Sequence, residues 1–134
     1  MTRFWLKLEQ AVEMVIEAVQ NMHGGELYVK KIPSMKMTDL AAAMAPDLNT
    51  VEIGIRPGEK IHEQMITQED AKNTIEFNDY YIILPEVRKE NIKNFYPTAK
   101  FVPEDFEYHS GKNEKWLSIE DMQKLIEEIG CESL

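Results

Sequence analysis

Cysteine is nearly absent from this sequence, in which Cys131 is the single cysteine. One cysteine excludes a disulfide within the chain and a zinc site made only of cysteines. So little cysteine is typical of a reducing compartment, and we expect the cytoplasm. Long apolar runs are also missing, because none approaches the roughly 20 residues that span a bilayer. The opening residues MTRFWLKLEQ lack a signal-peptide pattern, so we expect neither membrane insertion nor secretion.

Positive charge is scarce as well, because 15 Lys and Arg residues stand against 24 Asp and Glu residues, a net charge of −9. A surface of this sign does not displace counterions from nucleic acid and is repelled by anionic lipid. Nucleic acids and membranes are therefore not expected partners. What is present is a globular composition, with 43% hydrophobic and 29% charged residues in a chain of 134. This length predicts a single domain over residues 1–134.

Hydrophobic periodicity predicts short helices and short strands in irregular alternation. The predicted helices cover residues 2–23, 40–45, 59–66 and 119–129. The predicted strands cover residues 26–30, 51–55, 75–77 and 80–84. Residues 85–113 are polar and rich in turn formers, and we interpret them as an extended wrapping segment. Because the elements do not alternate regularly, the predicted fold class is a small α+β domain rather than a doubly wound parallel sheet.

Several helix ends carry signals of their own. The pair Gly24-Gly25 should stop the first helix, because glycine readily takes the left-handed conformation past a C-terminus. Thr38 or Asp39 is expected to cap the helix over residues 40–45. The run from Ser118 to Asp121 is a capping box, which predicts that Ser118 caps the last helix.

Signatures of cofactor and metal chemistry are incomplete. Gly54 and Gly58 are isolated, so the chain lacks a glycine-rich turn for a pyrophosphate and should not bind NAD or NADP by itself. His62-Glu63 begins like a helical zinc-protease motif, but Ile66 stands where the second histidine belongs. The three histidines of the chain show no spacing typical of a metal site. We therefore expect neither a cofactor nor a metal in this chain.

Two pairs, Tyr96 with Lys100 and Tyr108 with Lys112, match the Tyr-x-x-x-Lys spacing that short-chain dehydrogenases use on a helix. Pro97 follows the first tyrosine, and a Ser-Gly pair interrupts the second match. Proline and glycine disfavour a helix interior, so neither stretch should be helical. We predict that the chain has no catalytic residue of this kind.

One stretch with chemical content remains, Arg56-Pro57-Gly58-Glu59. The planar guanidinium of Arg56 suits a diphosphate, and the carboxylate of Glu59 can accept hydrogen bonds from ribose hydroxyls. The two side chains together would bind a nucleotide sugar. The alternative is a surface arginine in a turn, followed by a glutamate that starts a helix. Taken alone, the four residues favour that alternative.

Five strings in this order are similar to one protein family. They are TRFW at 2–5, GGE at 24–26, KIPSMK at 31–36, IRPGEKIHE at 55–63 and TIEFNDYY at 74–81. The chain resembles, from Thr2 to its last helix, the C-terminal half of the inverting UDP-N-acetylglucosamine 4,6-dehydratases. These are extended short-chain dehydrogenase/reductase proteins of bacterial polysaccharide and flagellin-sugar biosynthesis.

The resemblance implies a small substrate-binding domain with a few short strands and three or four helices, without the Rossmann half. In the family, the Rossmann domain holds NADP and the catalytic Tyr and Lys, so this chain is implied to be inactive alone. Arg56 matches the family residue that binds the diphosphate, and Glu59 matches the one near the uridine ribose. The implied partners are a UDP-sugar and a Rossmann domain of the same or an adjacent polypeptide.

Other interpretations stay open. Under the interpretation that the family resemblance implies, we expect the chain to be a cloned fragment, the product of a truncated gene or the product of a split gene. A second hypothesis is a non-enzymatic module that binds a partner protein, and a third is an independent hydrolase or transferase, for which no nucleophile–base pair is found. Without a Rossmann domain, Phe4, Trp5 and the strand faces should expose an apolar patch. Self-association covers such a patch, so we expect a homo-oligomer.

Overall fold

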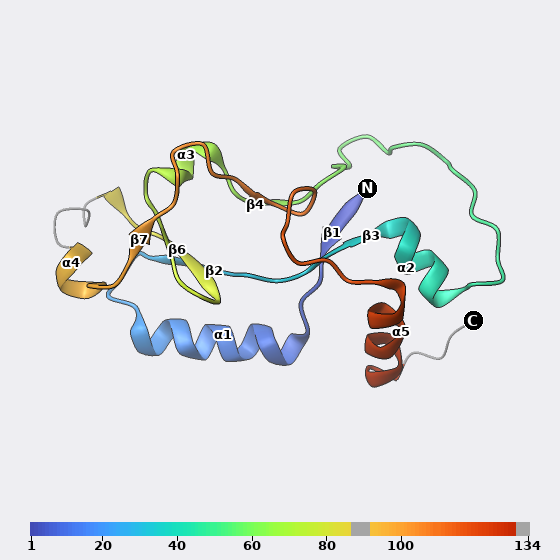
Figure 1. Ribbon diagram of the computed structural model, residues 1–134, viewed down its shortest axis with the longest axis horizontal. Helices are drawn as coiled ribbons and strands as arrows, with labels where there is room; N and C mark the ends of the chain where they lie inside the picture. Colours follow the sequence, from blue (N-terminus) through green and yellow to red (C-terminus); the bar gives the residue numbers. More distant parts are fainter. Residues whose placement is uncertain (87–91, 131–134) are drawn as a thin grey trace. The chain divides into compact units, whose positions relative to one another are not determined.

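The computed structural model of the chain describes residues 1–86 and 92–130 (Figure 1). Short helices combine with short strands that pair in antiparallel fashion, which confirms the predicted α+β class. The elements are β1 (Thr2–Phe4), α1 (Leu8–Asn21), β2 (Leu27–Lys30), β3 (Ser34–Lys36), α2 (Met37–Met44), β4 (Gln64–Ile66), α3 (Gln68–Ala71), β5 (Thr74–Glu76), β6 (Tyr80–Ile83), α4 (Ile92–Phe95), β7 (Lys100–Phe101), β8 (Tyr108–His109) and α5 (Ile119–Glu128). None of the helices described combines the length and the apolar character needed to cross a bilayer.

The chain packs as two compact units, of which the first contains residues 1–5, 33–63 and the described residues from 109 onward. Here β1 pairs with β3, and Arg3 lies opposite Met35. Helices α2 and α5 pack around an apolar core made of Met35, Ala43, Met122 and Ile126. Trp5 packs against this core. The expectation that Trp5 belongs to an exposed patch is therefore wrong, because the tryptophan finds apolar partners within its own unit.

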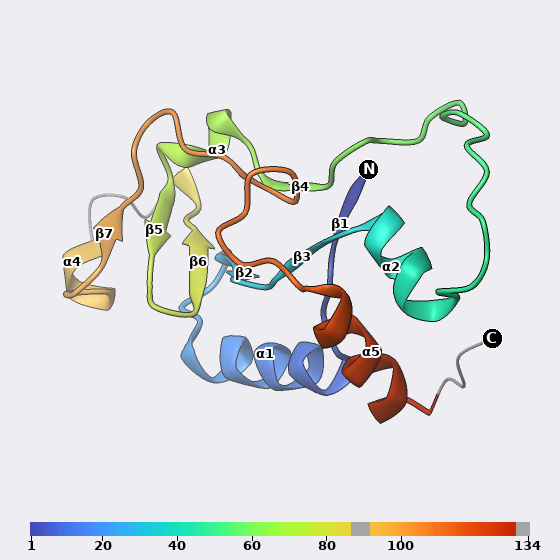
Figure 2. The same ribbon diagram turned by 45° about the vertical axis from the view of Figure 1, so that its right-hand side comes forward.

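The second unit, residues 6–32 and 64–108, contains an antiparallel sheet in the order β2-β6-β5-β7. The hairpin of β5 and β6 confirms the predicted pairing of residues 75–77 with 80–84 (Figure 2). Ile75 lies opposite Ile82, and both side chains are fully buried beside Leu84 in the core of the sheet. β4 pairs with β8 in a separate two-stranded sheet.

Some predicted elements are wrong, because the segment either has a strand partner that the sequence does not predict or lacks the one it needs. Residues 2–4 form a strand instead of helix because β3 pairs with them. Residues 51–55 form no strand: Val51 and Ile53 are 81% and 76% exposed, and Gly54 has a φ of +78°, which interrupts extended backbone. The predicted helix over residues 59–66 is replaced by irregular chain and β4.

Of the two predicted helix caps, one is confirmed and one is wrong. At Ser118 the box closes in both directions, because the Asp121 N–H donates to the serine oxygen at 3.1 Å and the Ser118 N–H donates to the aspartate at 3.0 Å. The cap predicted at Thr38 or Asp39 is wrong. Helix α2 begins at Met37, directly after β3, so both residues lie inside the helix, where the Thr38 hydroxyl donates to Asp39.

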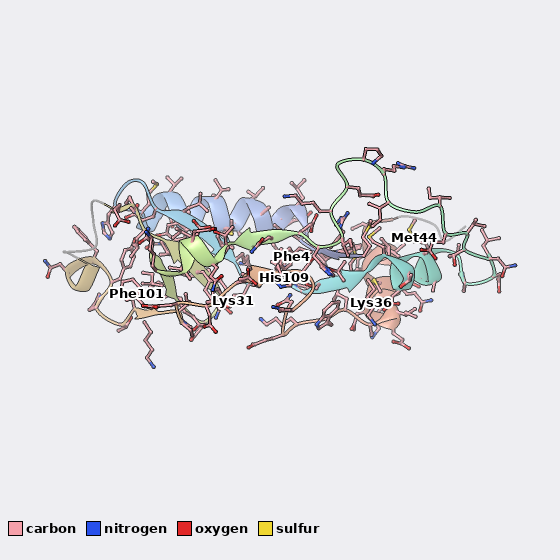
Figure 3. All side chains as sticks on the ribbon, turned by 90° about the horizontal axis from the view of Figure 1, so that it is seen from above. Phe4, Lys31, Lys36, Met44, Phe101 and His109 are labelled. Carbon is pink, nitrogen blue, oxygen red and sulfur yellow. The ribbon has the colours of Figure 1, made fainter. Side chains whose placement is uncertain are left out.

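Helix α1 is apolar over more of its circumference than its own unit covers. Ala11, Met14 and Ala18 are partly buried, and Met14 lines an apolar cavity of about 260 Å³ beside β2. Five larger residues are 50–75% exposed, namely Leu8, Val12, Val15, Ile16 and Val19. We call these five the α1 face. Side chains along one side of α1 project away from the strands of the same unit (Figure 3).

We predict that Ser118→Ala lowers the free energy of unfolding by about 1 kcal/mol, because the N-terminal N–H groups of α5 lose their side-chain acceptor. The matched control is Thr38→Ala, which should change the free energy of unfolding by less than about 0.5 kcal/mol because Thr38 caps no helix. Urea denaturation followed by circular dichroism measures both variants. Equal losses would contradict the assignment of the cap.

The pH dependence of the same variant follows from Asp121. Hydrogen bonds from the Ser118 backbone and side chain hold the pKa of Asp121 below its usual 3.8. A carboxyl whose pKa is lowered by folding stabilises the protein above its unfolded-state pKa, and this contribution is lost as the pH falls through the folded-state pKa. The difference in unfolding free energy between wild type and Ser118→Ala should therefore narrow below pH 3.8.

Candidate functional site

Arg56 and Glu59 lie in the first unit, on the exposed loop between α2 and β4. The chain turns tightly there, because the Glu59 N–H donates to the Arg56 carbonyl at 3.0 Å. Gly58, with a φ of +81°, follows Pro57 at the position of a type II turn that requires a left-handed residue. The Glu59 carboxylate closes the turn a second time by accepting the Arg56 N–H at 3.1 Å. These contacts fix the backbone of the turn while the Arg56 side chain stays exposed.

This geometry bears on the two interpretations of the turn. The surface alternative expects an exposed arginine in a turn, which the structure shows, and a glutamate that starts a helix, which is not observed because the chain is irregular from Glu59 to Glu63. An exposed guanidinium beside a closed turn can instead bind an anion through charge-assisted hydrogen bonds. The Glu59 carboxylate uses one oxygen for the Arg56 N–H, and its second oxygen can accept from a ligand hydroxyl.

Three segments distant in sequence meet where this loop ends, at Thr2 in β1, His62 and Ser110. The Thr2 hydroxyl oxygen lies 2.8 Å from His62 Nδ1 and 2.7 Å from the Ser110 hydroxyl oxygen. The Thr2 N–H donates to the Ile61 carbonyl at 2.9 Å. Thr2 is 7% exposed and Ser110 is fully buried. Water therefore has little access to the hydrogen bond between Thr2 and Ser110, and these two hydroxyls must satisfy one another, whereas His62 is exposed.

Glu63 joins β1 to Ser110 through contacts of both its side chain and its backbone. Its carboxylate accepts the Phe4 N–H at 2.7 Å and lies 3.6 Å from Arg3 Nε. Its N–H donates to the Ser110 hydroxyl oxygen at 2.9 Å, and its carbonyl accepts the Ser110 N–H at 2.8 Å. Phe4 and His109, labelled in Figure 3, mark this junction. The strings TRFW and IRPGEKIHE therefore meet in space.

As predicted, neither tyrosine of the two Tyr-x-x-x-Lys matches lies on a helix. Tyr96 follows α4 and donates to Glu26 at 3.3 Å. Tyr108, buried in β8, donates to the Ile32 carbonyl at 3.0 Å and accepts the Ile32 N–H at 2.8 Å. Burial raises the pKa of both phenols. A raised pKa disfavours deprotonation near neutral pH, so both tyrosines are suited to packing and hydrogen bonding rather than to base catalysis.

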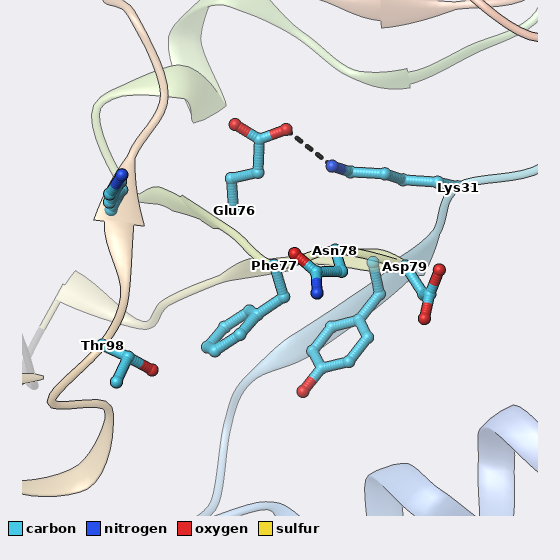
Figure 4. Close-up of a pocket in the computed structure, with 8 residues that line it drawn as sticks. Lys31, Glu76, Phe77, Asn78, Asp79 and Thr98 are labelled. Atoms are coloured by element: carbon cyan, nitrogen blue, oxygen red, sulfur yellow. Dashed lines mark hydrogen bonds and ion pairs between the residues drawn. The ribbon is translucent and has the colours of Figure 1, made fainter.

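The second unit has a surface pocket of about 670 Å³ beside the β5–β6 hairpin (Figure 4). Lys31 and Glu76 form an ion pair at 2.6 Å in its lining, which also includes Asp79 and Lys100. Charges of both signs balance there, so the lining favours neither a diphosphate nor a metal cation. Among the residues described, no group of three or more His, Cys, Asp and Glu side chains could hold a metal ion.

Sequence reasoning does not find the junction of Thr2, His62 and Ser110. Thr2 and Ser110 are separated by 108 positions, and no periodicity links residues so far apart. A serine in a polar segment predicts only a turn. The signal in the sequence that points toward the junction is the presence of the family strings TRFW and IRPGEKIHE, because both carry residues that meet there.

Comparison with known proteins finds relatives along nearly the whole chain. A family profile described as "Polysaccharide biosynthesis protein" matches residues 1–85. The UDP-N-acetylglucosamine 4,6-dehydratase (inverting) of Campylobacter jejuni is 44% identical over 132 residues, which cover 94% of this chain and 40% of that protein. The UDP-glucose 4-epimerase of Rickettsia massiliae is 28% identical over 130 residues, which cover 94% of this chain and 38% of that protein.

A solved structure, described as Pen from Bacillus thuringiensis, matches with a TM-score of 0.77 at 28% identity. The match covers 98% of this chain and 38% of that one. The chain thus spans about two fifths of the length of the curated relatives it matches. These findings confirm the resemblance to the inverting 4,6-dehydratases that the five strings indicate.

We predict that Gly111→Ala destabilises the first unit. A Cβ at Gly111 would lie 2.6 Å from His62 Nδ1 and 2.9 Å from Cγ, and the ring cannot retreat without losing Thr2. The free energy of unfolding should fall by about 1–3 kcal/mol, the usual cost of overpacking. The control is a double-mutant cycle with His62→Ala, which makes room for the new methyl group. An equal cost of Gly111→Ala in both backgrounds, measured by urea denaturation, would refute the clash.

Proposed function

This chain belongs to the polysaccharide biosynthesis protein family, and we propose that it is the UDP-sugar-binding part of a nucleotide-sugar 4,6-dehydratase of the UDP-N-acetylglucosamine class. The proposal is supported by 44% identity to the inverting dehydratase of Campylobacter jejuni over 94% of this chain. Its role is in bacterial polysaccharide or glycan biosynthesis. In this proposal the chain supplies substrate binding and does not catalyse the reaction alone.

The observation that carries the binding role is the closed turn at Arg56 and Glu59. Two hydrogen bonds, at 3.0 and 3.1 Å, hold the turn while the Arg56 side chain is exposed. We assign the Arg56 guanidinium to the diphosphate, whose oxygens match its planar fork. We assign the free oxygen of the Glu59 carboxylate to a ribose hydroxyl. The turn then contacts the diphosphate and the ribose, which all UDP-sugars contain.

The remaining components of the enzyme lie outside this chain. We propose that NADP and the catalytic groups belong to a Rossmann domain of the same or an adjacent polypeptide. The α1 face supports this proposal, because five large apolar residues that are at least half exposed favour burial against a partner. The single cysteine of the sequence fits a reducing cytoplasm as the place of this assembly.

A second candidate function follows from the same face. A non-enzymatic module that binds a partner protein through α1 also needs exposed apolar side chains, and it needs no nucleotide site. The two functions differ at Arg56, because only the sugar-binding function requires its guanidinium. Nucleotide binding therefore discriminates between them.

We predict that the chain binds UDP with a dissociation constant near 1 mM, which corresponds to about 4 kcal/mol. Arg56→Ala should weaken binding about tenfold to a hundredfold, because charge-assisted hydrogen bonds contribute about 1.5–3 kcal/mol each. Titration with UDP followed by NMR shifts of the amides at residues 56–59 measures both values. NADP, titrated in the same way, should show no micromolar affinity, because the chain lacks a glycine-rich turn for the dinucleotide.

The matched control is Lys60→Ala, which removes the same charge from an exposed position in the same loop. It should bind UDP within about twofold of wild type, since net charge alone acts weakly in salt. Glu59→Ala should cost less than Arg56→Ala, because water can replace a ribose contact. In a complete dehydratase, Arg56→Ala should raise the KM for the UDP-sugar by about tenfold to a hundredfold. Equal UDP affinity of Arg56→Ala and Lys60→Ala would overturn the assignment.

We predict that the isolated chain self-associates through the α1 face. Val15→Lys should shift the sedimentation profile toward monomer, because a charge in an apolar interface is costly to bury. The added lysine also reduces the net charge of −9, so greater repulsion between copies cannot explain the loss. The control is Leu48→Lys, at a residue outside α1 that is 66% exposed, compared with 58% for Val15. A wild-type chain that is monomeric at high micromolar concentration would contradict this prediction.

A further inference from the structure

We infer that Thr2, Glu63 and Ser110 form a loop clamp that holds the turn of Arg56 and Glu59 ready for its ligand. Thr2 and Ser110 are then positioning residues for the nucleotide site, although neither contacts the ligand. This inference rests on the proposed function, because it concerns how the Arg56 guanidinium is presented.

The loop that carries Arg56 and Glu59 is anchored directly after the turn. Residues 46–60 are exposed along their whole length, so packing contributes little to their order. Immediately afterwards, three consecutive residues are tied to other segments. The Ile61 carbonyl accepts the Thr2 N–H, and the His62 ring contacts the Thr2 hydroxyl. The Glu63 N–H donates to the Ser110 hydroxyl oxygen, and the Glu63 carbonyl accepts the Ser110 N–H. Glu59 precedes the first anchored residue by only two positions, so the clamp restrains the turn directly.

The clamp tolerates the loss of neither the Thr2 hydroxyl nor the Ser110 hydroxyl. The Glu63 N–H donates to the Ser110 oxygen at 2.9 Å, so the Ser110 hydroxyl must donate onward to Thr2, either to its hydroxyl oxygen at 2.7 Å or to its carbonyl at 3.2 Å. Ser110 is fully buried, so water cannot take over these contacts. Removal of one hydroxyl leaves buried polar groups unpaired, and the backbone must move to satisfy them.

The clamp affects the affinity for a diphosphate through the position of the Arg56 backbone. A guanidinium binds a diphosphate best when both of its parallel N–H groups meet oxygens, and this geometry depends on the position of the backbone. A displacement of about 1 Å can cost up to about a hundredfold where alignment matters. A loop that must first become ordered also loses affinity through conformational entropy. Release of the loop at residues 61–63 has both consequences.

The experiment compares Thr2→Val, which keeps the shape but loses the hydroxyl, with Thr2→Ser, which keeps the hydroxyl. The matched control is Thr74→Val in the second unit, where a fully buried threonine donates to the Asp70 carbonyl at 2.8 Å. UDP affinity is measured by NMR titration of the full chain well below the melting temperature, and amide hydrogen exchange is measured at Arg56 and Glu59. Ser110→Ala tests the same contacts from the other side.

Thr2→Val and Ser110→Ala should weaken UDP binding by about fivefold to twentyfold and accelerate exchange at Arg56 and Glu59. Thr2→Ser should restore both properties to within about twofold, and Thr74→Val should lower the melting temperature without changing either. Unchanged exchange in Thr2→Val, or an equal loss of affinity in Thr74→Val, would overturn the clamp. The proposed function fails separately, if Arg56→Ala leaves UDP affinity unchanged. In that case the exchange rates at Arg56 and Glu59 still decide whether the clamp exists.

Discussion

The buried hydroxyl of Ser110 holds the first unit together, because it accepts a hydrogen bond from the Glu63 backbone and donates one to Thr2. Through these contacts the N-terminal strand, the end of the loop after α2 and the segment after β8 share one small polar centre. Gly111 keeps this centre compact, since a larger residue would meet the His62 ring. Two of the strings that relate the chain to its family, TRFW and IRPGEKIHE, therefore belong to one structural junction beside the turn of Arg56 and Glu59.

The second unit follows a different constraint, which is apolar surface in excess of what it can cover. Its sheet buries Ile75 and Ile82 efficiently, but α1 keeps five large apolar residues at least half exposed. The exposed side chains of this helix favour burial against a second apolar surface, as the proposed function expects. The two units thus divide the proposed work between ligand recognition and association.

Sequence reasoning recovers elements whose signals are local. The hairpin at residues 74–83, the strand at Leu27–Lys30 and the Ser118 cap are present because alternation and capping act between near neighbours. It fails where a distant partner decides. Residues 2–4 become a strand because β3 pairs with them, whereas residues 51–55 remain irregular although their alternation predicts a strand.

The candidate site also combines a local feature that the sequence predicts with a distant contact that it does not predict. The turn at Arg56–Glu59 is predictable because Pro57-Gly58 sets its backbone, and its assignment to a nucleotide comes from the family strings. The contact between Thr2 and Ser110 is not predictable, because it joins residues 108 positions apart whose types have ordinary local roles. Likewise, the Glu59 carboxylate has a structural role, because it accepts a hydrogen bond from the Arg56 N–H. A search for ligand contacts does not consider this role.

A crystal structure of the chain grown with saturating UDP tests the central claim most directly. The proposed function predicts electron density for the diphosphate at the Arg56 turn, with guanidinium nitrogens about 2.7–2.9 Å from phosphate oxygens. It also predicts that the turn keeps its hydrogen bonds between Arg56 and Glu59. Diphosphate bound elsewhere on the chain, with Arg56 directed into solvent, would contradict the claim.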